Sequence, residues 1–356
     1  MIRVLIVDDS SLARRVLREL LSSDPSIEVV GEASDGQEAI SKVIALRPDV
    51  VTMDVRMPVL DGLAATEQIM AYHPTRILAI TSLVSQREIN VGFQMLGAGA
   101  LDVMDKPASL RGPELERMRR ELIERVKLLS RVRVVTHLRG RRTRSLPTPT
   151  IVPALSGGVR SSRPVVVIGA STGGPKALQT VLAGLPKDFP APIVVVQHIA
   201  EGFVAGMVEW LSATCRLPIV LARHGQRLQS GEVVVASDGM HLLVDEEQRV
   251  IQTDLPQTPQ RPSVDVTMES VAQSVGRRAI GVLLTGMGRD GALGMAAIRR
   301  AGGYTIAQDE ATSAIFGMPK AAIEMGAVVE VLPVEQIAPA LLVRLGAEQR
   351  APTSSP

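Results

Sequence analysis

The chain is poor in cysteine, in aromatic residues and in long apolar runs, and each shortage excludes a class of protein. Its one cysteine, Cys215, cannot form an intramolecular disulfide, and a single cysteine offers no spacing typical of a metal site. A chain without disulfides is typical of a reducing compartment. We expect Cys215 to be a small core residue. Aromatic residues make up 2% of the sequence, so aliphatic side chains must fill the cores, and stacking on nucleic-acid bases is not expected. No apolar run approaches the roughly 18 residues of a membrane span, and Asp8 and Asp9 interrupt the N-terminal apolar stretch. We therefore expect a cytoplasmic protein that does not insert into a membrane.

The charge is close to balance, with a formal net charge of +2. Much of the basic excess lies between Arg111 and Arg144, including the run at residues 139–144. This run precedes a stretch rich in proline, glycine and serine, so a solvated linker explains it better than a nucleic-acid contact does. We expect no nucleic-acid partner.

A chain of 356 residues is expected to form at least two cores, and its apolar pattern predicts two α/β domains. Short Val/Ile/Leu runs alternate with helical stretches in both halves, which indicates parallel sheets covered by helices. Strands are expected near residues 3–7, 27–31, 49–53, 77–81 and 101–104 in the first half, and near 165–168, 193–197, 218–222, 280–284 and 304–307 in the second. Three further runs, at residues 231–235, 241–244 and 249–252, suggest a β-hairpin insertion. The fold class is therefore α/β, a (βα)5 domain followed by a doubly wound, mainly parallel sheet with a hairpin insertion.

The boundaries follow from the same pattern. We assign residues 1–125 to the first domain, 126–162 to a linker, 163–347 to the second domain and 348–356 to a disordered tail.

Carboxylates follow two apolar strands of the first domain. Asp8 and Asp9 come directly after residues 4–7, and Asp54 comes directly after residues 50–53. Three carboxylates that converge at one sheet edge form an oxygen-rich site suited to Mg²⁺. Thr81 and Lys106 follow two later strands and are expected at the same edge.

These residues resemble the receiver domain of two-component response regulators. The resemblance lies in Val-Asp-Asp-Ser, Met-Asp-Val-Arg-Met-Pro, Asp-Gly, Ile-Thr-Ser and Asp-Lys-Pro, and it covers residues 1–125. It implies that Asp54 accepts a phosphoryl group and that Asp8, Asp9, Asp54 and the backbone carbonyl of Arg56 bind Mg²⁺. It also implies that Thr81 moves toward the phosphate and that Lys106 pairs with it.

A serine, a histidine and an aspartate follow strands of the second domain. Ser171 lies in a glycine-rich turn after residues 165–168, His198 follows residues 193–197, and Asp290 follows residues 280–284. Because the carboxyl ends of parallel strands share one edge, the three can supply a nucleophile, a general base and an orienting carboxylate. The alternative of a nucleotide-binding phosphate loop at residues 169–176 is weakened because Pro175 interrupts the motif and Ala177 replaces the Mg²⁺-binding hydroxyl.

The second half resembles the catalytic domain of the chemotaxis protein-glutamate methylesterases, the CheB family. The shared motifs are Ile-Gly-Ala-Ser-Thr-Gly-Gly, Gln-His, Arg-Pro-Ser-Val-Asp, Leu-Thr-Gly-Met-Gly-x-Asp-Gly and Phe-Gly-Met-Pro, spread over residues 163–347. The family has a proline where this chain has Ala200, and Ser237-Asp238-Gly239 replaces a Pro-Gly-Asp-like turn, departures that leave the triad intact.

The resemblance implies a phosphorylation-activated esterase that works through Ser171, His198 and Asp290, with backbone N–H groups of Thr172 and Met287 at the oxyanion. It implies methyl-accepting chemoreceptors as substrates, glutamine deamidation by the same acyl chemistry, and a CheA-type histidine kinase as phosphodonor. No cofactor is expected at the esterase site, and we expect a monomer.

Two other outputs remain open at this point: a DNA-bound or nucleotide-sensing regulator, and a pseudoenzyme that docks on receptors or a kinase without catalysis. The other histidines show no ligand spacing, so we interpret His73, His137, His224 and His241 as loop or surface residues. Trp210 is expected to fill the apolar side of a helix with Val204, Met207, Val208 and Leu211.

Overall fold

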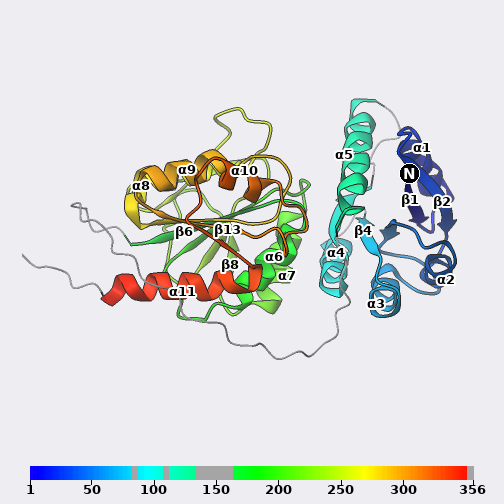
Figure 1. The fold of residues 1–356 in the computed structure, drawn as a ribbon, viewed down its shortest axis with the longest axis horizontal. Coiled ribbons are helices and arrows are strands. Elements are labelled where there is room, and N and C mark those ends of the chain that lie inside the picture. The colour runs from blue at the N-terminus through cyan, green and yellow to red at the C-terminus, as the bar shows by residue number, and fades with distance from the viewer. Residues whose placement is uncertain (82–85, 107–111, 133–162, 351–356) are drawn as a thin grey trace, which may run out of the picture.

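The computed structural model describes residues 1–81, 86–106, 112–132 and 163–350, and it contains two parallel sheets, each covered by helices (Figure 1). The two-domain α/β prediction is confirmed. Most of the predicted linker and the end of the predicted tail, including His137, lie outside the described residues.

The N-terminal sheet has five parallel strands in the order β2-β1-β3-β4-β5. The strands are β1 (Ile2–Val7), β2 (Ile27–Ala33), β3 (Val50–Asp54), β4 (Arg76–Thr81) and β5 (Asp102–Asp105), and the helices are α1 (Ser11–Ser22), α2 (Gly36–Leu46), α3 (Gly62–Tyr72), α4 (Gln86–Ala98) and α5 (Pro113–Leu129). Successive side chains of β1 alternate between two apolar clusters. Leu5 and Val7 pack toward α2, α3 and α4, whereas Val4 and Ile6 pack toward α1 and α5.

Short polar residues end the loops of this domain and begin its helices. The side chains of Ser10, Asp35 and Asp61 accept hydrogen bonds from N–H groups in the first turns of α1, α2 and α3. β1 and β2 pass into α1 and α2 within a few residues, so these two loops at the carboxyl edge are short.

The C-terminal sheet has seven strands in the order β14-β13-β12-β6-β7-β9-β8, and every pair of neighbouring strands is parallel. Its strands are β6 (Val165–Ala170), β7 (Ile193–Gln197), β8 (Ile219–Leu221), β9 (Val233–Val235), β12 (Ala279–Leu283), β13 (Tyr304–Gln308) and β14 (Glu330–Leu332). The strands that follow β6 in the chain are added on one side of the sheet, and those that follow β12 are added on the other. The topological switch point therefore lies between β6 and β12. In open α/β sheets the ligand site is found at this point, beyond the carboxyl ends of the strands.

Helices cover both faces of this sheet (Figure 1). One face carries α8 (Val264–Val275), α9 (Ala292–Arg300) and α10 (Met318–Glu324), and the other carries α6 (Gly174–Ala183), α7 (Val204–Thr214) and α11 (Val334–Arg350). Among the described residues, no helix combines the length and the apolar character that crossing a bilayer requires.

The predicted hairpin insertion is smaller than expected. The antiparallel hairpin consists of β10 (His241–Val244) and β11 (Val250–Thr253) alone. Our assignment of residues 231–235 to the hairpin is wrong. The strand there, β9 (Val233–Val235), is fully buried and pairs in parallel with β7 and β8 inside the main sheet.

The two domains meet through an aromatic cluster between α4 and α7. The ring of Phe93 stacks on Trp210 at a centroid distance of 5.9 Å and meets Phe203 edge to face at 6.4 Å. At its border, the amide of Asn90 donates to the carboxylate of Glu209 at 2.6 Å. Phe93 and Phe203 are fully buried, so the apolar core is continuous from one domain to the other. Trp210 therefore fills an apolar helix face, as predicted, but part of its partner surface belongs to the other domain.

Candidate active site and phosphorylation pocket

The carboxylates of Asp8, Asp9 and Asp54 come together at the carboxyl edge of the N-terminal sheet. One oxygen from each lies within 4.8 Å of the others. Asp8 and Asp9 follow β1 and Asp54 ends β3, its direct neighbour in the sheet. Adjacent parallel strands therefore deliver all three acidic groups to one place.

Lys106 neutralises part of this charge. Its Nζ lies 2.8 Å from a carboxylate oxygen of Asp8 and 2.8 Å from one of Asp54. Burial raises the pKa of Asp54 to about 6, with Lys106 acting in the opposite direction and the charge of Asp8 adding to the increase. Burial lowers the pKa of Lys106, but its hydrogen bonds to Asp54 and Asp8 outweigh that effect and raise it. One ammonium group shared by two buried carboxylates leaves the pocket short of positive charge.

The donor set fits a hard divalent cation. Asp8 is almost fully buried, and the ammonium of Lys106 contacts its Oδ2 at 2.8 Å. Carboxylates that outnumber the cationic groups beside them are costly to bury, and a divalent cation with oxygen ligands would balance their charge. The position of the Arg56 carbonyl as a ligand stays a prediction, and the Arg56 guanidinium pairs with Glu88 at 3.2 Å.

Thr81 ends the strand that lies between the strands leading to Asp54 and Lys106. It ends β4, which pairs with β3 on one side and β5 on the other, and its side chain is buried. Its carbonyl accepts the N–H of Lys106 at 2.7 Å. Any movement of Thr81 is thus linked to the loop that carries Lys106.

Gly62 begins α3 against the backbone of Asp54. A β-carbon at Gly62 would lie 1.9 Å from the Asp54 carbonyl oxygen, a distance that no small adjustment can relieve. We expect Gly62→Ala to shift β3 or α3, to lower the melting temperature of this domain by several degrees and to reduce phosphorylation of Asp54. Gly346→Ala in α11, where nothing lies near the added carbon, is the matched control and should not destabilise the protein. Calorimetry and phosphate incorporation measure both variants, and a Gly62→Ala protein that melts and incorporates phosphate like wild type would contradict this packing.

Ser171 follows β6 at the switch point of the C-terminal sheet. Its N–H donates to the carbonyl of Thr285 at 3.0 Å, and its own carbonyl accepts the N–H of Gly174 at 2.7 Å, which closes a turn into α6. Gly173 has a φ of 75°, the left-handed conformation that glycine adopts without strain. Gly286 packs on the serine from the β12 side, since a β-carbon there would lie 2.7 Å from that of Ser171. The serine is partly exposed at the end of the strand.

Gln197 connects the serine to the histidine. Its Nε2 donates to the carbonyls of both Ser171 and His198, each at 2.8 Å. The register agrees, because Ala170 pairs with Gln197 and the next residue of each strand is the candidate nucleophile or base. Sequence reasoning missed this role of Gln197, although it stands beside the histidine in the Gln-His pair.

Asp290 holds the other side of His198. The two side chains lie 2.8 Å apart between His198 Nε2 and Asp290 Oδ2. The carboxylate also accepts the Ser263 hydroxyl at 2.8 Å and the N–H groups of Val264 and Asp265 at 2.7 and 3.0 Å, all from the N-terminus of α8. Burial would raise the pKa of Asp290, but the hydrogen bond and charge of His198 and these N–H donors lower it. Asp290 is therefore a fully hydrogen-bonded anion at neutral pH.

This contact defines the imidazole tautomer. An ionised Asp290 can only accept, so Nε2 of His198 carries the proton and Nδ1 is the basic nitrogen. Among the described residues, no hydrogen bond joins the Ser171 hydroxyl to His198. The structure thus brings serine and histidine side by side through their backbones and joins histidine and aspartate directly.

The N–H groups of Thr172 and Met287 have no acceptor among the described residues. Thr285 connects their loops, because its hydroxyl donates to the Thr172 carbonyl at 3.0 Å and accepts the Ile315 N–H at 2.9 Å. Two unpaired donors on either side of Ser171 are compatible with an oxyanion site.

A second carboxylate, Asp265, supports the first. Its Oδ1 accepts the N–H groups of Gly291 and Gly294 at the start of α9, both at 2.8 Å. Asp265 from α8 thus caps α9, and Asp290 from the start of α9 caps α8. Burial and the nearby charge of Asp290 raise the pKa of Asp265, and the N–H of Gly294 opposes this. The signal for Asp265 was its place in the Arg-Pro-Ser-Val-Asp motif.

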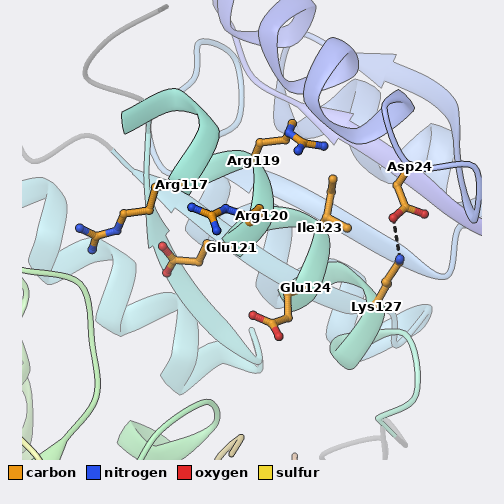
Figure 2. Close-up of a pocket in the computed structure, with 8 residues that line it drawn as sticks. All are labelled: Asp24, Arg117, Arg119, Arg120, Glu121, Ile123, Glu124 and Lys127. Carbon is orange, nitrogen blue, oxygen red and sulfur yellow. Dashed lines mark hydrogen bonds and ion pairs between the residues drawn. The ribbon is translucent and has the colours of Figure 1, made fainter. Parts of the chain in front are cut away.

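A separate hollow lies along α5, shown in Figure 2. It is lined by Asp24, Arg117, Arg119, Arg120, Glu121, Ile123, Glu124 and Lys127. Asp24 and Lys127 pair across it at 2.6 Å, and this hydrogen bond together with those from Ser26 lowers the pKa of Asp24 to about 2. It contains none of the candidate catalytic or phosphorylation residues.

Fold and sites together define a two-domain response regulator with an enzymatic output domain. Residues 4–114 match the model of the response regulator receiver domain, and residues 166–341 match that of the CheB methylesterase. The chain belongs to the CheB methylesterase family.

Two relatives span nearly the same length. A protein-glutamate methylesterase/protein-glutamine glutaminase of Anaeromyxobacter dehalogenans is 48% identical over 96% of both chains, and one of Myxococcus xanthus is 45% identical over 93% of this chain and 90% of the relative. The CheB methylesterase catalytic domain of Thermotoga maritima, a crystal structure, is 38% identical with a TM-score of 0.50 and covers 51% of this chain and 99% of its own. The alternatives of a DNA-bound or docking-only output are not favoured.

Proposed function

We propose that this protein is a phosphorylation-activated hydrolase that demethylates glutamate methyl esters on methyl-accepting chemoreceptors and deamidates glutamines by the same route. The observation that carries the proposal is the His198–Asp290 pair, held beside Ser171 by Gln197 at the switch point of the sheet. The single cysteine supports a location in the cytoplasm, where the receptor methylation sites would be reached.

In the first half-reaction, Ser171 Oγ attacks the γ-carbonyl carbon of the methylated glutamate while His198 Nδ1 takes the hydroxyl proton. Asp290 stabilises the imidazolium that forms. The N–H groups of Thr172 and Met287 receive the charge on the carbonyl oxygen. The carbon–oxygen bond to the methoxy group then breaks, and the departing oxygen takes the proton from His198 as methanol.

In the second half-reaction, a water molecule gives a proton to His198 and attacks the glutamyl-serine ester. The bond to Ser171 Oγ breaks, the serine recovers its proton, and a glutamate carboxylate is released. With glutamine as substrate, ammonia leaves in place of methanol and the acyl enzyme is the same. No cofactor takes part in either step.

In the receiver domain, Asp54 accepts the phosphoryl group of a CheA-type histidine kinase. Asp8, Asp9, Asp54 and the Arg56 carbonyl would hold Mg²⁺, which neutralises phosphoryl charge when bound. Lys106 pairs with the new phosphate. Thr81, at the end of β4 between β3 and β5, moves toward it. Loss of the Lys106 contacts with Asp54 changes the environment at the end of β5.

The end of β5 lies close to the segment that follows His198. Met104, Asp105 and Lys106 line the same hollow as Ala200, Glu201 and Gly202, two to four residues after His198. We propose that the unphosphorylated receiver restrains this segment and access to Ser171, and that phosphorylation shifts the population toward an open arrangement. The aromatic contact of Phe93 with Trp210 holds the closed form.

The central test is incubation of the full chain, as a monomer in solution, with methylated receptor. We expect methanol release that rises when acetyl phosphate and Mg²⁺ are added. Release of no methanol from a receptor that a known methylesterase demethylates would refute the function, and equal rates with and without phosphodonor would refute the gating.

The domain interface gives a second prediction. Asn90→Asp would place a carboxylate against that of Glu209 and weaken docking, so we expect methanol release without phosphodonor to rise several-fold. The double variant Asn90→Asp/Glu209→Gln replaces the repulsion with a hydrogen bond and should return the rate toward wild type. A wild-type rate of methanol release without phosphodonor in the Asn90→Asp variant would show that this contact takes no part in gating.

A further inference from the structure

His241 is a buried histidine outside the triad, and our interpretation of it as a loop or surface residue is wrong. It begins β10 and is fully buried. Its Nδ1 accepts the N–H of Ser263 at 3.1 Å, and its Nε2 lies 2.9 Å from the carbonyl oxygen of Pro256. Because an N–H can only donate and a carbonyl can only accept, Nδ1 is unprotonated and Nε2 carries the proton. Both ring nitrogens therefore contact backbone groups, and Nε2 also lies 3.4 Å from the Thr258 hydroxyl.

The residue that His241 holds is the one that positions Asp290. Ser263 is the N-cap of α8, and its hydroxyl donates to Asp290 Oδ1 at 2.8 Å. The next N–H, from Val264, donates to Asp290 Oδ2 at 2.7 Å, and that oxygen also contacts His198. Three hydrogen bonds in series thus connect the ring of His241 to the ring of the catalytic histidine.

We propose that His241 is a positioning residue of the esterase reaction, which acts by fixing the N-terminus of α8 and through it the Asp290 carboxylate. The inference rests on the proposed function, since it presupposes that Asp290 orients His198. Ser263 is 3% exposed, so without an acceptor its N–H would be buried and unpaired. The α8 terminus would then move to find a partner, and a displacement of about 1 Å at such a group can lower a rate roughly 10²-fold.

The two ring nitrogens of His241 contact different backbone segments. Nε2 holds Pro256 in the loop before α8, whereas Nδ1 holds the N-cap itself. Only the second contact leads to Asp290. A role limited to the loop would depend on Nε2, and a role in catalysis depends on Nδ1.

Two variants distinguish these roles in the full chain. The oxygen of an asparagine can take the place of Nδ1, so His241→Asn keeps an acceptor for Ser263. The amide nitrogen of a glutamine can take the place of Nε2, so His241→Gln keeps the Pro256 contact and loses the acceptor. We expect His241→Gln to lower kcat for methanol release about 10- to 100-fold with KM within twofold of wild type. We expect His241→Asn to retain about half of the wild-type kcat or more.

The assay uses methylated receptor with acetyl phosphate and Mg²⁺, and thermal melting checks that each variant is folded. A wild-type kcat for His241→Gln, or an equal loss in both variants, would overturn the inference while leaving the proposed function intact. A KM increase that accounts for the loss would also overturn it. No methanol from the wild-type chain would refute the proposed function and this inference together.

A second pair leaves His241 unchanged and tests the same series of bonds. Ser263→Ala removes the hydroxyl that reaches Asp290, and Ser263→Thr keeps one. We expect the alanine variant to lose about tenfold in kcat at unchanged KM and the threonine variant to stay within about threefold. Equal kcat values for the alanine and threonine variants would contradict the proposal that the Ser263 hydroxyl positions Asp290.

Discussion

Ser171→Ala is expected to lower methanol release by at least about 10⁴-fold, because removal of the nucleophile leaves only the binding and oxyanion contributions of a serine hydrolase. The loss should fall on kcat, with KM nearly unchanged, since the hydroxyl makes its decisive interaction after substrate has bound. Melting should not change, because the serine is partly exposed and its turn is closed by backbone hydrogen bonds that alanine retains. Methanol release and labelling by a serine-directed fluorophosphonate are the two measurements.

Ser274→Ala is the matched control for that experiment. Ser274 lies in α8 of the same domain, and its hydroxyl donates to the carbonyl of Val271 in the same helix at 3.4 Å. Its variant should keep the wild-type rate and the label. Residual activity above about one hundredth in Ser171→Ala, well beyond what binding alone supplies, would show that another residue is the nucleophile.

The sequence was most informative where chemistry depends on a strand end. Asp54, Ser171 and His198 each stand at the end of an apolar run that forms a parallel strand, so the place of each at the carboxyl edge of its own sheet could be predicted from local pattern alone. Helix starts were predictable for the same reason: Ser10 caps α1 through its own side chain, and this signal is confined to a few residues.

The misses share one cause, which is that they depend on partners far along the chain. Val233–Val235 is apolar and β-branched, which favours a strand but does not say which strand it pairs with. His241 finds its partners 15 and 22 residues away, at Pro256 and Ser263, and neither contact leaves a periodic trace in the sequence. Gln197 and Asp265 stand in motifs that the sequence displays, but the hydrogen bonds that give each its role join segments far apart in the chain, and the motifs do not reveal those partners.

Asp54→Asn is expected to abolish phosphate incorporation and, with it, all stimulation of the esterase by acetyl phosphate. The amide has nearly the shape of the carboxylate but cannot act as the nucleophile, while Asp8 still holds Lys106 at 2.8 Å. Asp49→Asn, at the residue just before β3, is the matched control, because an amide oxygen can still accept the N–H of Arg3. Radiolabel incorporation and methanol release with and without phosphodonor measure the effect.

The stability of Asp54→Asn tests the electrostatics of the same pocket. Since the folded state raises the pKa of Asp54 from 3.8 to about 6, the carboxylate lowers stability as pH rises through that interval, and the cost is fully present at neutral pH. A shift of that size corresponds to a cost on the order of 3 kcal/mol, so without Mg²⁺ the asparagine variant should melt several degrees above wild type at pH 7 and no higher at pH 4. Mg²⁺ should stabilise wild type more than the variant and narrow the difference. If the Asp54→Asn variant still incorporates one phosphate per chain, another residue is the phosphoryl acceptor. If it melts below wild type at pH 7, the attraction of Lys106 for the Asp54 carboxylate outweighs the cost of burying that carboxylate.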